Sequence, residues 1–222
     1  MTDRLLETVE VNPPGEIRAC VIWLHGLGDS GHGFAPIVPE LKLPDDKGIR
    51  FVFPHAPVRP ITINNGYAMH AWYDIRSMEL DKRADPEGVR ESAEQVAGLI
   101  QREIDAGIAA DKIVLAGFSQ GGVIALHLGS RFPQRLAGIL ALSTYMSEPE
   151  RLDGEAHPAN RQTPILMCHG RMDEVVPMTY GRQAYNSLEA AGFAVQWHDF
   201  MMQHNVCVEE IELISQWLQT RL

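Results

Sequence analysis

The sequence predicts an α/β protein whose mainly parallel central sheet carries helices on both faces. The first observation behind this class is that apolar runs of strand length recur along the chain with helix-like segments between them. The second is one stretch, residues 113–128, that has the pattern of a strand, a sharp turn and a helix. Proline and glycine stand at most joints between these segments, as expected where regular elements end.

Six apolar runs have the length and the bounding residues of strands. In chain order they are residues 19–24, 50–53, 113–116, 136–142, 165–168 and 194–198. Four other segments have helical periodicity: residues 86–105, 121–132, 179–191 and 206–220. We expect the strands to form one sheet and the helices to cover it.

Two segments, residues 54–81 and 143–163, fit neither pattern. Both follow strands, and open α/β sheets bind ligands at the carboxyl ends of their strands. We therefore expect these segments to be the walls of a pocket. No insertion has the size of the cap domain that covers many lipases, so we expect the pocket to be a surface cleft.

With 222 residues, of which 45% are hydrophobic, the chain is long enough for one well-filled core and too short for two enzyme domains with separate cores. We expect residues 1–222 to form a single domain. The 29 Asp and Glu residues outnumber the 19 Lys and Arg residues, giving a formal net charge of −10, and no basic stretch could follow a phosphate backbone. This charge pattern argues against nucleic acid as a partner.

The first seven residues mix acids with two leucines and lack the apolar centre of a signal peptide. No run approaches the roughly 18 apolar residues that a membrane span needs. Three cysteines, Cys20, Cys168 and Cys207, lie in contexts typical of buried residues, which indicates free thiols in a reducing compartment. We expect a cytoplasmic protein without a membrane span.

The turn after residues 113–116 has the sequence Gly117-Phe118-Ser119-Gln120-Gly121. A serine hydroxyl is a poor nucleophile at neutral pH, so it must stand on a strained turn where a base can reach it. Glycines two residues to either side give such a turn room. The five-residue pattern is common by chance, but its place between strand and helix makes it specific. We interpret it as the nucleophile elbow of an α/β-hydrolase, with Ser119 as the nucleophile.

In this fold the acid and the base follow the serine in that order. His204 follows the last expected strand and can reach the carboxyl edge of the sheet, whereas His198 lies inside a strand pattern that fixes its direction. Asp173 follows a buried strand, where it can orient the imidazole, although the adjacent Glu174 can serve instead and a turn aspartate is the alternative role. Asp199 stands too close to His204 in sequence to be the separate acid.

Acyl transfer also needs two backbone N–H donors aimed at the developing oxyanion. We expect one to be Gln120, which follows the nucleophile at a helix N-terminus. The other is expected at Leu27, in the glycine-rich loop 25–31 after the first apolar run, because flanking glycines let the backbone approach closely.

The same loop matches G-x-G-x-x-G, the dinucleotide fingerprint, but no acid ends the second strand to hold a ribose. No H-E-x-x-H motif and no clustered Cys/His spacing occurs, and His25, His32, His55 and His70 are scattered over loops. We therefore expect neither a cofactor nor a metal. His25 and His169 each precede a glycine at a strand end and are expected to tie loop backbone together.

Several motifs in one order now identify a resemblance: His-Gly-Leu-Gly-Asp at residues 25–29, the Gly-Phe-Ser-Gln-Gly-Gly elbow, Leu-Ser-Thr-Tyr at 142–145 and Val-Cys-Val-Glu-Glu at 206–210. The chain resembles the small carboxylesterase and acyl-protein thioesterase family, also described as the phospholipase/carboxylesterase family, from residue 19 to residue 217. The resemblance implies a capless α/β-hydrolase with a Ser119, Asp173 and His204 triad, and oxyanion donors at Leu27 and Gln120.

The resemblance also covers residues 60–64 and 69–75 of the long irregular segment. Met69 and Trp72 are the substrate-contacting residues expected there, with Trp72 as an apolar wall for an acyl chain or, alternatively, a filler of the core. One departure is Gln203, which stands immediately before His204 where the family usually has glycine. Glycine permits backbone conformations that glutamine resists, so the effect of Gln203 on His204 stays open.

The main functional hypothesis is a serine hydrolase that cleaves short- to medium-chain carboxylic esters through an acyl-enzyme. One alternative is an acyl-protein thioesterase, which needs a long apolar groove. The other is a non-catalytic binding module in which Gln203 disables the histidine. The expected partner is a small-molecule ester or thioester, and a homodimer is compatible with the sequence because some relatives form one.

Overall fold

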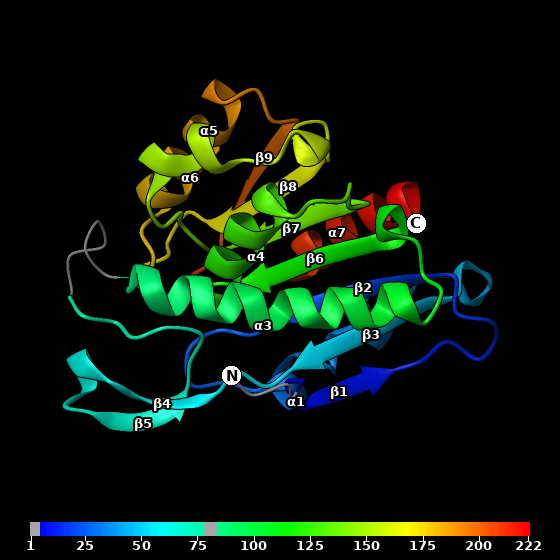
Figure 1. Cartoon of the computed structure of the whole chain (residues 1–222), viewed down its shortest axis with the longest axis horizontal. Helices are drawn as coiled ribbons and strands as arrows, with labels where there is room; N and C mark the ends of the chain where they lie inside the picture. Colours follow the sequence, from blue (N-terminus) through cyan, green and yellow to red (C-terminus); the bar gives the residue numbers. More distant parts are fainter. Residues whose placement is uncertain (1–4, 78–83) are drawn as a thin grey trace.

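The computed structural model describes residues 5–77 and 84–222. Within these residues a seven-stranded sheet has the order β1-β3-β2-β6-β7-β8-β9 (Figure 1). Strand β1 pairs antiparallel with β3, and every other pair in this sheet is parallel. The strands are β1 (Thr8–Val11), β2 (Ala19–Leu24), β3 (Ile49–Pro54), β6 (Ile113–Phe118), β7 (Gly138–Leu142), β8 (Ile165–Gly170) and β9 (Val195–Phe200).

In the described part of the chain, four helices longer than two turns pack on this sheet. They are α3 (Pro86–Asp105), α4 (Gln120–Arg131), α6 (Met178–Ala190) and α7 (Val208–Arg221). Short helices complete the described chain: α1 (Gly31–Phe34), α2 (Ile37–Glu40), α5 (Leu152–Glu155), η1 (Asp45–Lys47), η2 (Thr62–Asn64), η4 (Ala110–Lys112), η5 (Pro149–Arg151) and η6 (Pro158–Asn160). None of the described helices is both long and apolar enough to cross a membrane.

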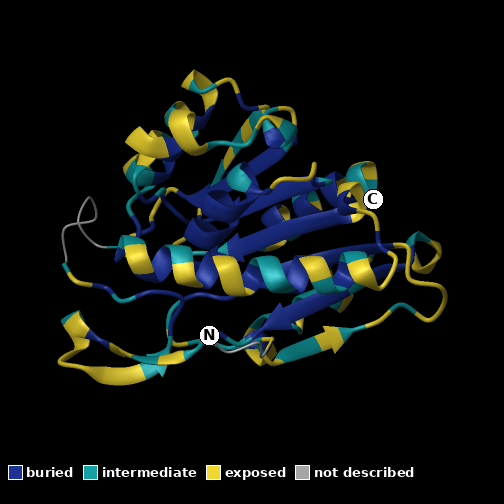
Figure 2. Ribbon diagram, viewed as in Figure 1, coloured by how far each residue is buried: buried dark blue, intermediate teal, exposed yellow. Residues whose placement is uncertain are grey.

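The two faces of the sheet form two hydrophobic clusters, because successive side chains of a strand point to opposite sides. On β2, Ile22 and Leu24 pack with buried residues of α3, α4 and α6, whereas Val21 and Trp23 pack with buried residues of α7. In Figure 1, α3 and α4 cover the near face and α7 lies behind the sheet. The five inner strands, β3, β2, β6, β7 and β8, are accordingly buried along most of their length, whereas the edge strands β1 and β9 are partly exposed (Figure 2).

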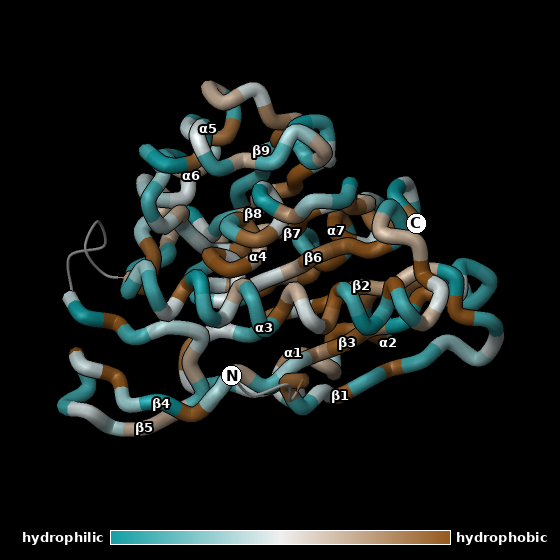
Figure 3. The backbone as a smooth tube through the Cα atoms, in the orientation of Figure 1, coloured by the Kyte–Doolittle hydropathy of each residue, from teal (hydrophilic) through white to brown (hydrophobic). Residues whose placement is uncertain are grey.

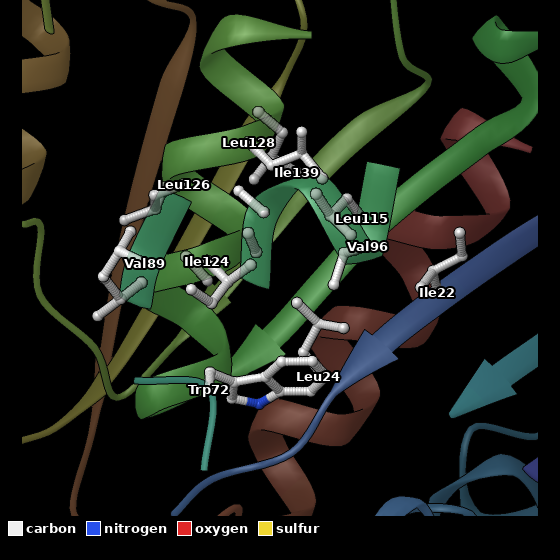
Figure 4. Packing of buried hydrophobic residues seen from close by; sticks show 14 of the residues in the cluster. Ile22, Leu24, Trp72, Val89, Val96, Leu115, Ile124, Leu126, Leu128 and Ile139 are labelled. Carbon is white, nitrogen blue, oxygen red and sulfur yellow. The ribbon is translucent and has the colours of Figure 1, made fainter. Parts of the chain in front are cut away.

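Helix α3 shows how the sequence pattern sets the packing. Pro86 occupies its first turn, where a missing N–H costs nothing. Its buried residues include Val89, Ala93, Val96 and Ile100, at spacings of three and four that make one apolar stripe. Hydrophilic residues alternate with these apolar ones along the helix (Figure 3). In the close view of Figure 4, Val96 of α3 lies beside Leu115 of β6, and Trp72 lies beside Leu24 at the edge of the same cluster.

All six expected strands and all four expected helices are present, with ends that differ by a few residues. The sequence missed β1 and the hairpin of β4 (Val58–Ile61) and β5 (Tyr67–His70). β1 is a half-exposed edge strand with Glu10 in it, and β4 contains Pro60, which sequence patterns count against a strand. Of the expected wall segment 54–81, the last four residues lie outside the described chain.

Candidate active site

Ser119 stands on the sharp turn between β6 and α4. Its backbone has φ 52° and ψ −117°, a conformation that costs a non-glycine residue about 1–3 kcal/mol. The flanking glycines are required by space, because a Cβ at Gly117 would lie within 3.0 Å of Gly121 O, and one at Gly121 within 3.0 Å of Leu24 O. The elbow therefore brings the start of α4 directly against the end of β2 and turns the serine outward.

Three side chains from distant parts of the chain meet at this turn. The Nε2 atom of His204 lies 2.9 Å from Ser119 Oγ, and its Nδ1 atom lies 2.7 Å from Asp173 Oδ2. A carboxylate can only accept, so Nδ1 carries the proton and Nε2 presents a lone pair to the serine hydroxyl. The structure thus brings together the three residues that the sequence singled out, in the connectivity of a nucleophile, a base and an orienting acid.

The buried Asp173 carboxylate is held on its other side by backbone. Its Oδ1 atom accepts hydrogen bonds from the Val175 N–H at 2.9 Å and the Val176 N–H at 2.8 Å. Burial pushes the pKa of Asp173 upward, but the hydrogen bond with His204, the backbone donor and the nearby imidazoles outweigh burial and leave this pKa below its ordinary value. The carboxylate is therefore ionised when it faces the imidazole.

The competing acids and bases are elsewhere. Glu174 is exposed, and Asp199 bonds to Arg171 and to the Trp197 Nε1–H. His198 is exposed on the edge strand β9. None of these three residues lines the cleft that contains Ser119.

His204 lies in the connection between β9 and α7, which is packed tightly on β8. A Cβ at Gly170 would fall within 3.0 Å of the carbonyl oxygens of Met202 and Gln203, so only glycine lets the loop approach this closely. Gln203 is exposed and is not among the described residues with positive φ. The glutamine therefore occupies an ordinary backbone conformation, and its presence does not prevent His204 from reaching Ser119.

Leu27 and Gln120 both line the cleft beside Ser119 and His204. Gln120 is the first residue of α4, where backbone N–H groups have no helical partner. Its side chain has a task that the sequence did not reveal: Oε1 accepts the Trp72 backbone N–H at 2.8 Å, and Nε2 donates to Tyr73 O at 2.7 Å. The sequence signal for this contact is the glutamine itself, because a polar side chain that is buried directly after Ser119 needs hydrogen-bond partners in a neighbouring segment.

The cleft has a volume of about 240 Å³. Both irregular segments supply its walls, as expected: Tyr73 and Ile75 come from the first and Tyr145 from the second. The two tyrosine hydroxyls lie 2.9 Å apart. Val175 and Val176 complete the apolar side; the sequence analysis missed these wall residues because nothing in their local pattern distinguishes them from core.

The two expected substrate contacts are placed differently. Trp72 is fully buried, its Nε1–H donates to His25 O at 2.9 Å, and it fills the core, which is the alternative that the sequence left open. Its neighbours Tyr73 and Ile75 form the wall instead. Met69 is half-buried on β5, next to Gly28 of the loop after β2, and does not line this cleft.

His25 and His169 bind loop backbone, as the sequence predicts. The His25 Nδ1–H donates to Gly26 O at 2.6 Å, and the His169 ring donates to Val176 O at 2.8 Å. No group of three or more His, Cys, Asp or Glu residues within the described chain could hold a metal ion. The early histidines are scattered along the sequence, but the fold brings the centres of neighbouring rings within 5.2 to 6.3 Å of one another, which the sequence did not indicate.

The sheet order, the capless cleft and the elbow define an α/β-hydrolase, and comparison with known proteins shows that the chain is a hydrolytic enzyme. Residues 7–222 match the sequence profile described as Phospholipase/Carboxylesterase. The chain belongs to this family.

Three relatives illustrate the match. Acyl-protein thioesterase 1 of Neurospora crassa is 40% identical over 214 residues, which are 92% of this chain and 87% of the relative. The crystal structure of Zea mays acyl-protein thioesterase 2 superposes with a TM-score of 0.87 at 31% identity, covering 97% of this chain and 98% of that one. The crystal structure of esterase PE8 gives a TM-score of 0.84 at 26% identity and covers 99% of this chain and 100% of its own.

Proposed function

We propose that the protein is a serine-dependent acyl thioesterase in which Ser119 is the nucleophile, His204 the base and Asp173 its orienting acid. The observation that carries the proposal is the pair of short contacts that His204 makes with Ser119 Oγ and Asp173 Oδ2 at the edge of an apolar cleft. Two relatives named acyl-protein thioesterase, one 40% and one 31% identical, support the thioester as the scissile group.

Acylation begins when the Nε2 atom of His204 accepts the hydroxyl proton of Ser119 and Oγ attacks the acyl carbonyl. The carbonyl oxygen becomes an oxyanion, to which the backbone N–H groups of Leu27 and Gln120 donate. Asp173 stabilises the imidazolium that forms. The tetrahedral intermediate collapses with cleavage of the C–S bond, and the imidazolium returns its proton to the departing thiolate.

Deacylation repeats these steps with water. His204 accepts a proton from a water molecule, whose oxygen attacks the acyl-serine carbonyl. The second intermediate expels Ser119 Oγ, which takes the proton back from Nε2, and the carboxylic acid leaves. The protons balance, because the thiol leaves with the proton of Ser119 and water returns one to Ser119 through His204.

A second candidate function is hydrolysis of short- to medium-chain oxygen esters, the hypothesis that the sequence favoured. The volume of the cleft supports it, because about 240 Å³ is below the roughly 300–1,000 Å³ of pockets that bury drug-sized ligands. The description of the matched profile and the likeness to esterase PE8 also support it. The relatives of greatest identity reported above favour the thioester, so we place the oxygen ester second.

Matched substrates separate the two functions. Acyl thioesters and p-nitrophenyl esters from acetyl to palmitoyl are compared by kcat/KM for wild type and Ser119→Ala. Higher kcat/KM for thioesters at equal chain length supports the thioesterase, and the reverse order supports the esterase. Turnover by Ser119→Ala equal to that of wild type would refute the serine mechanism.

Within this proposal residues 1–222 act as one domain, because the three triad side chains belong to one sheet and its loops. The three free cysteines, of which Cys20 and Cys168 are buried, fit a reducing, cytoplasmic setting.

A further inference from the structure

Four histidines and a tryptophan form a row of rings beside the cleft. The row begins at the exposed His32, whose ring centre lies 5.2 Å from that of His55. His55 lies 5.9 Å from His70, and His70 lies 6.3 Å from His25. The fully buried Trp72 ends the row, 5.3 Å from His25. These residues come from the loop after β2 and the helix α1 that follows it, from the end of β3, and from the end of β5 with the segment after it, so the row joins three segments of the chain.

Two of these imidazoles, His25 and His70, form hydrogen bonds with the backbone of Ala56. Its N–H donates to His25 Nε2 at 3.0 Å, and its carbonyl accepts the His70 Nδ1–H at 2.6 Å. His55, the residue before it, accepts the Gly31 N–H at Nδ1 at 3.2 Å. Two of these three bonds need a lone pair on a ring nitrogen, so the imidazoles of His25 and His55 must be neutral to make them.

The environment keeps these two rings neutral. Burial lowers the pKa of His25 to about 4, against smaller opposing contributions from the Gly26 carbonyl and Asp29. Burial also lowers the pKa of His55, and the neighbouring His32 and His70 act in the same direction against Glu7.

Hydrogen bonds connect this row of rings to the loop of Leu27 and to Gln120, which supply the two amides that we expect to bind the oxyanion. The loop that contains Leu27 is fixed at Gly28, whose N–H donates to His70 O at 2.8 Å, and at Gly31 through His55. Trp72 links this loop to Gln120, since its Nε1–H donates to His25 O and its backbone N–H donates to Gln120 Oε1.

We propose that His55 is a positioning residue, whose side chain holds the loop 25–31 through the Gly31 amide so that the Leu27 amide faces the oxyanion. This inference rests on the proposed function, because it needs Leu27 to be an oxyanion donor. An oxyanion contact strengthens in the transition state, so loosening its support lowers kcat and leaves KM nearly unchanged.

The test compares His55→Leu, His55→Asn and His198→Leu at about pH 8, where free imidazole is neutral. His55→Leu removes the acceptor for the Gly31 N–H, and we expect kcat to fall about tenfold, less than the roughly 100-fold that follows loss of a whole donor. His55→Asn places a carbonyl oxygen near the position of Nδ1 and is expected to restore most of kcat. His198→Leu, an identical change at an exposed histidine on β9, is expected to match wild type.

A second measurement follows the loop itself. Amide hydrogen exchange of residues 26–31 is expected to be faster in His55→Leu than in wild type and unchanged in His198→Leu. If His55→Leu does not fold, His55→Ala is used in its place. The inference would be overturned if His55→Leu kept the kcat of wild type or changed KM alone. It would also be overturned if His55→Asn did not restore kcat, or if the amide exchange of residues 26–31 were the same in His55→Leu and wild type.

The outcome is separable from that of the proposed function. Wild type that neither hydrolyses acyl esters or thioesters nor reacts with a fluorophosphonate at Ser119 refutes the proposed function, whatever the exchange shows. Active wild type with an unaffected His55→Leu variant refutes only the positioning role.

Discussion

The two oxygens of Asp173 have different partners, and this asymmetry fixes the tautomer of His204. Oδ1 accepts two backbone N–H groups, so the side chain cannot rotate freely, and Oδ2 is left to accept the His204 Nδ1–H. In Asp173→Asn the amide NH₂ group can face Nδ1, which favours a proton on Nε2 and removes the lone pair that Ser119 needs. We expect kcat to fall about 10³- to 10⁴-fold with KM little changed.

The matched control for this change is Glu174→Gln, an equivalent substitution at the adjacent exposed carboxylate. Steady-state kinetics of both variants on one ester check the prediction. A similar loss in both variants, or retention of kcat in Asp173→Asn, would contradict the role of Asp173.

Gln203 departs from the family pattern at a position where the backbone does not adopt the conformation that favours glycine. Because its φ is not positive, replacing it with glycine relieves no strain. We expect Gln203→Gly to keep kcat within about twofold of wild type and to lower the free energy of unfolding by about 0.5–1 kcal/mol, through the greater freedom of glycine in the unfolded chain. Urea unfolding and ester kinetics measure both quantities, and a marked gain in kcat would show that Gln203 constrains His204.

The junction of β6 and α4 is the element on which the site depends most. Its glycines allow the first turn of α4 to lie against the end of β2, and Gly122 meets Thr144 of the segment after β7 in the same way. In Gly121→Ala the added methyl group must displace backbone, because Leu24 O and His25 O occupy its place. We expect a loss of about 2 kcal/mol or more in stability and a large loss in kcat.

Gly154→Ala in α5 is the control for this prediction, since no atom lies within 4 Å of its added Cβ and the helical propensity of alanine is higher. We expect it to be neutral or slightly stabilising. Thermal melting of both variants checks the comparison, and a Gly121→Ala protein that melts and turns over like wild type would show that α4 can shift without disturbing Ser119.

Features of this protein that are encoded within a few neighbouring residues could be predicted from the sequence, whereas contacts between distant segments could not. β2 and the elbow could be predicted because their apolar runs and glycines carry the signal within a few residues. The triad followed from the chain order of the fold. The Gln120 bridge to Trp72, a separation of 48 residues, and the row of histidines could not be predicted, because each depends on how loops from different strands meet. β4 was missed because it contains Pro60, which sequence patterns count against a strand, and because it pairs only with β5, in a hairpin outside the main sheet.

From the pKa shifts of its buried ionisable groups, we expect the stability of the fold to be greatest in the middle of the pH range. Burial lowers the pKa of both His25 and His127 from 6.5 to about 4. Between these pH values the unfolded state binds protons that the folded state does not, so the free energy of unfolding falls as pH drops from 6.5 toward 4. Burial raises the pKa of Glu210, at the start of α7, from 4.5 to about 8, so the folded state binds a proton that the unfolded state has released in that interval. Stability from this group is complete below pH 4.5 and is lost as pH rises to 8.

The histidines and Glu210 change the free energy of unfolding in opposite directions as pH rises. The number of protons that each set of groups binds or releases on unfolding decides the net slope. Between pH 4.5 and 6.5, His25 and His127 outweigh Glu210, so these three groups raise stability by about 1.4 kcal/mol per pH unit, and the lowered pKa values of His55 and His169 add to the rise. Between pH 6.5 and 8, Glu210 alone among these groups has different protonation in the folded and unfolded states, and stability falls by about 1.4 kcal/mol per pH unit. We expect the free energy of unfolding in urea to peak near pH 6.5. Glu210→Gln should flatten the alkaline side, whereas Glu209→Gln, at the exposed neighbouring position, should retain it. An alkaline slope in Glu210→Gln as steep as that of wild type would exclude Glu210 as its origin.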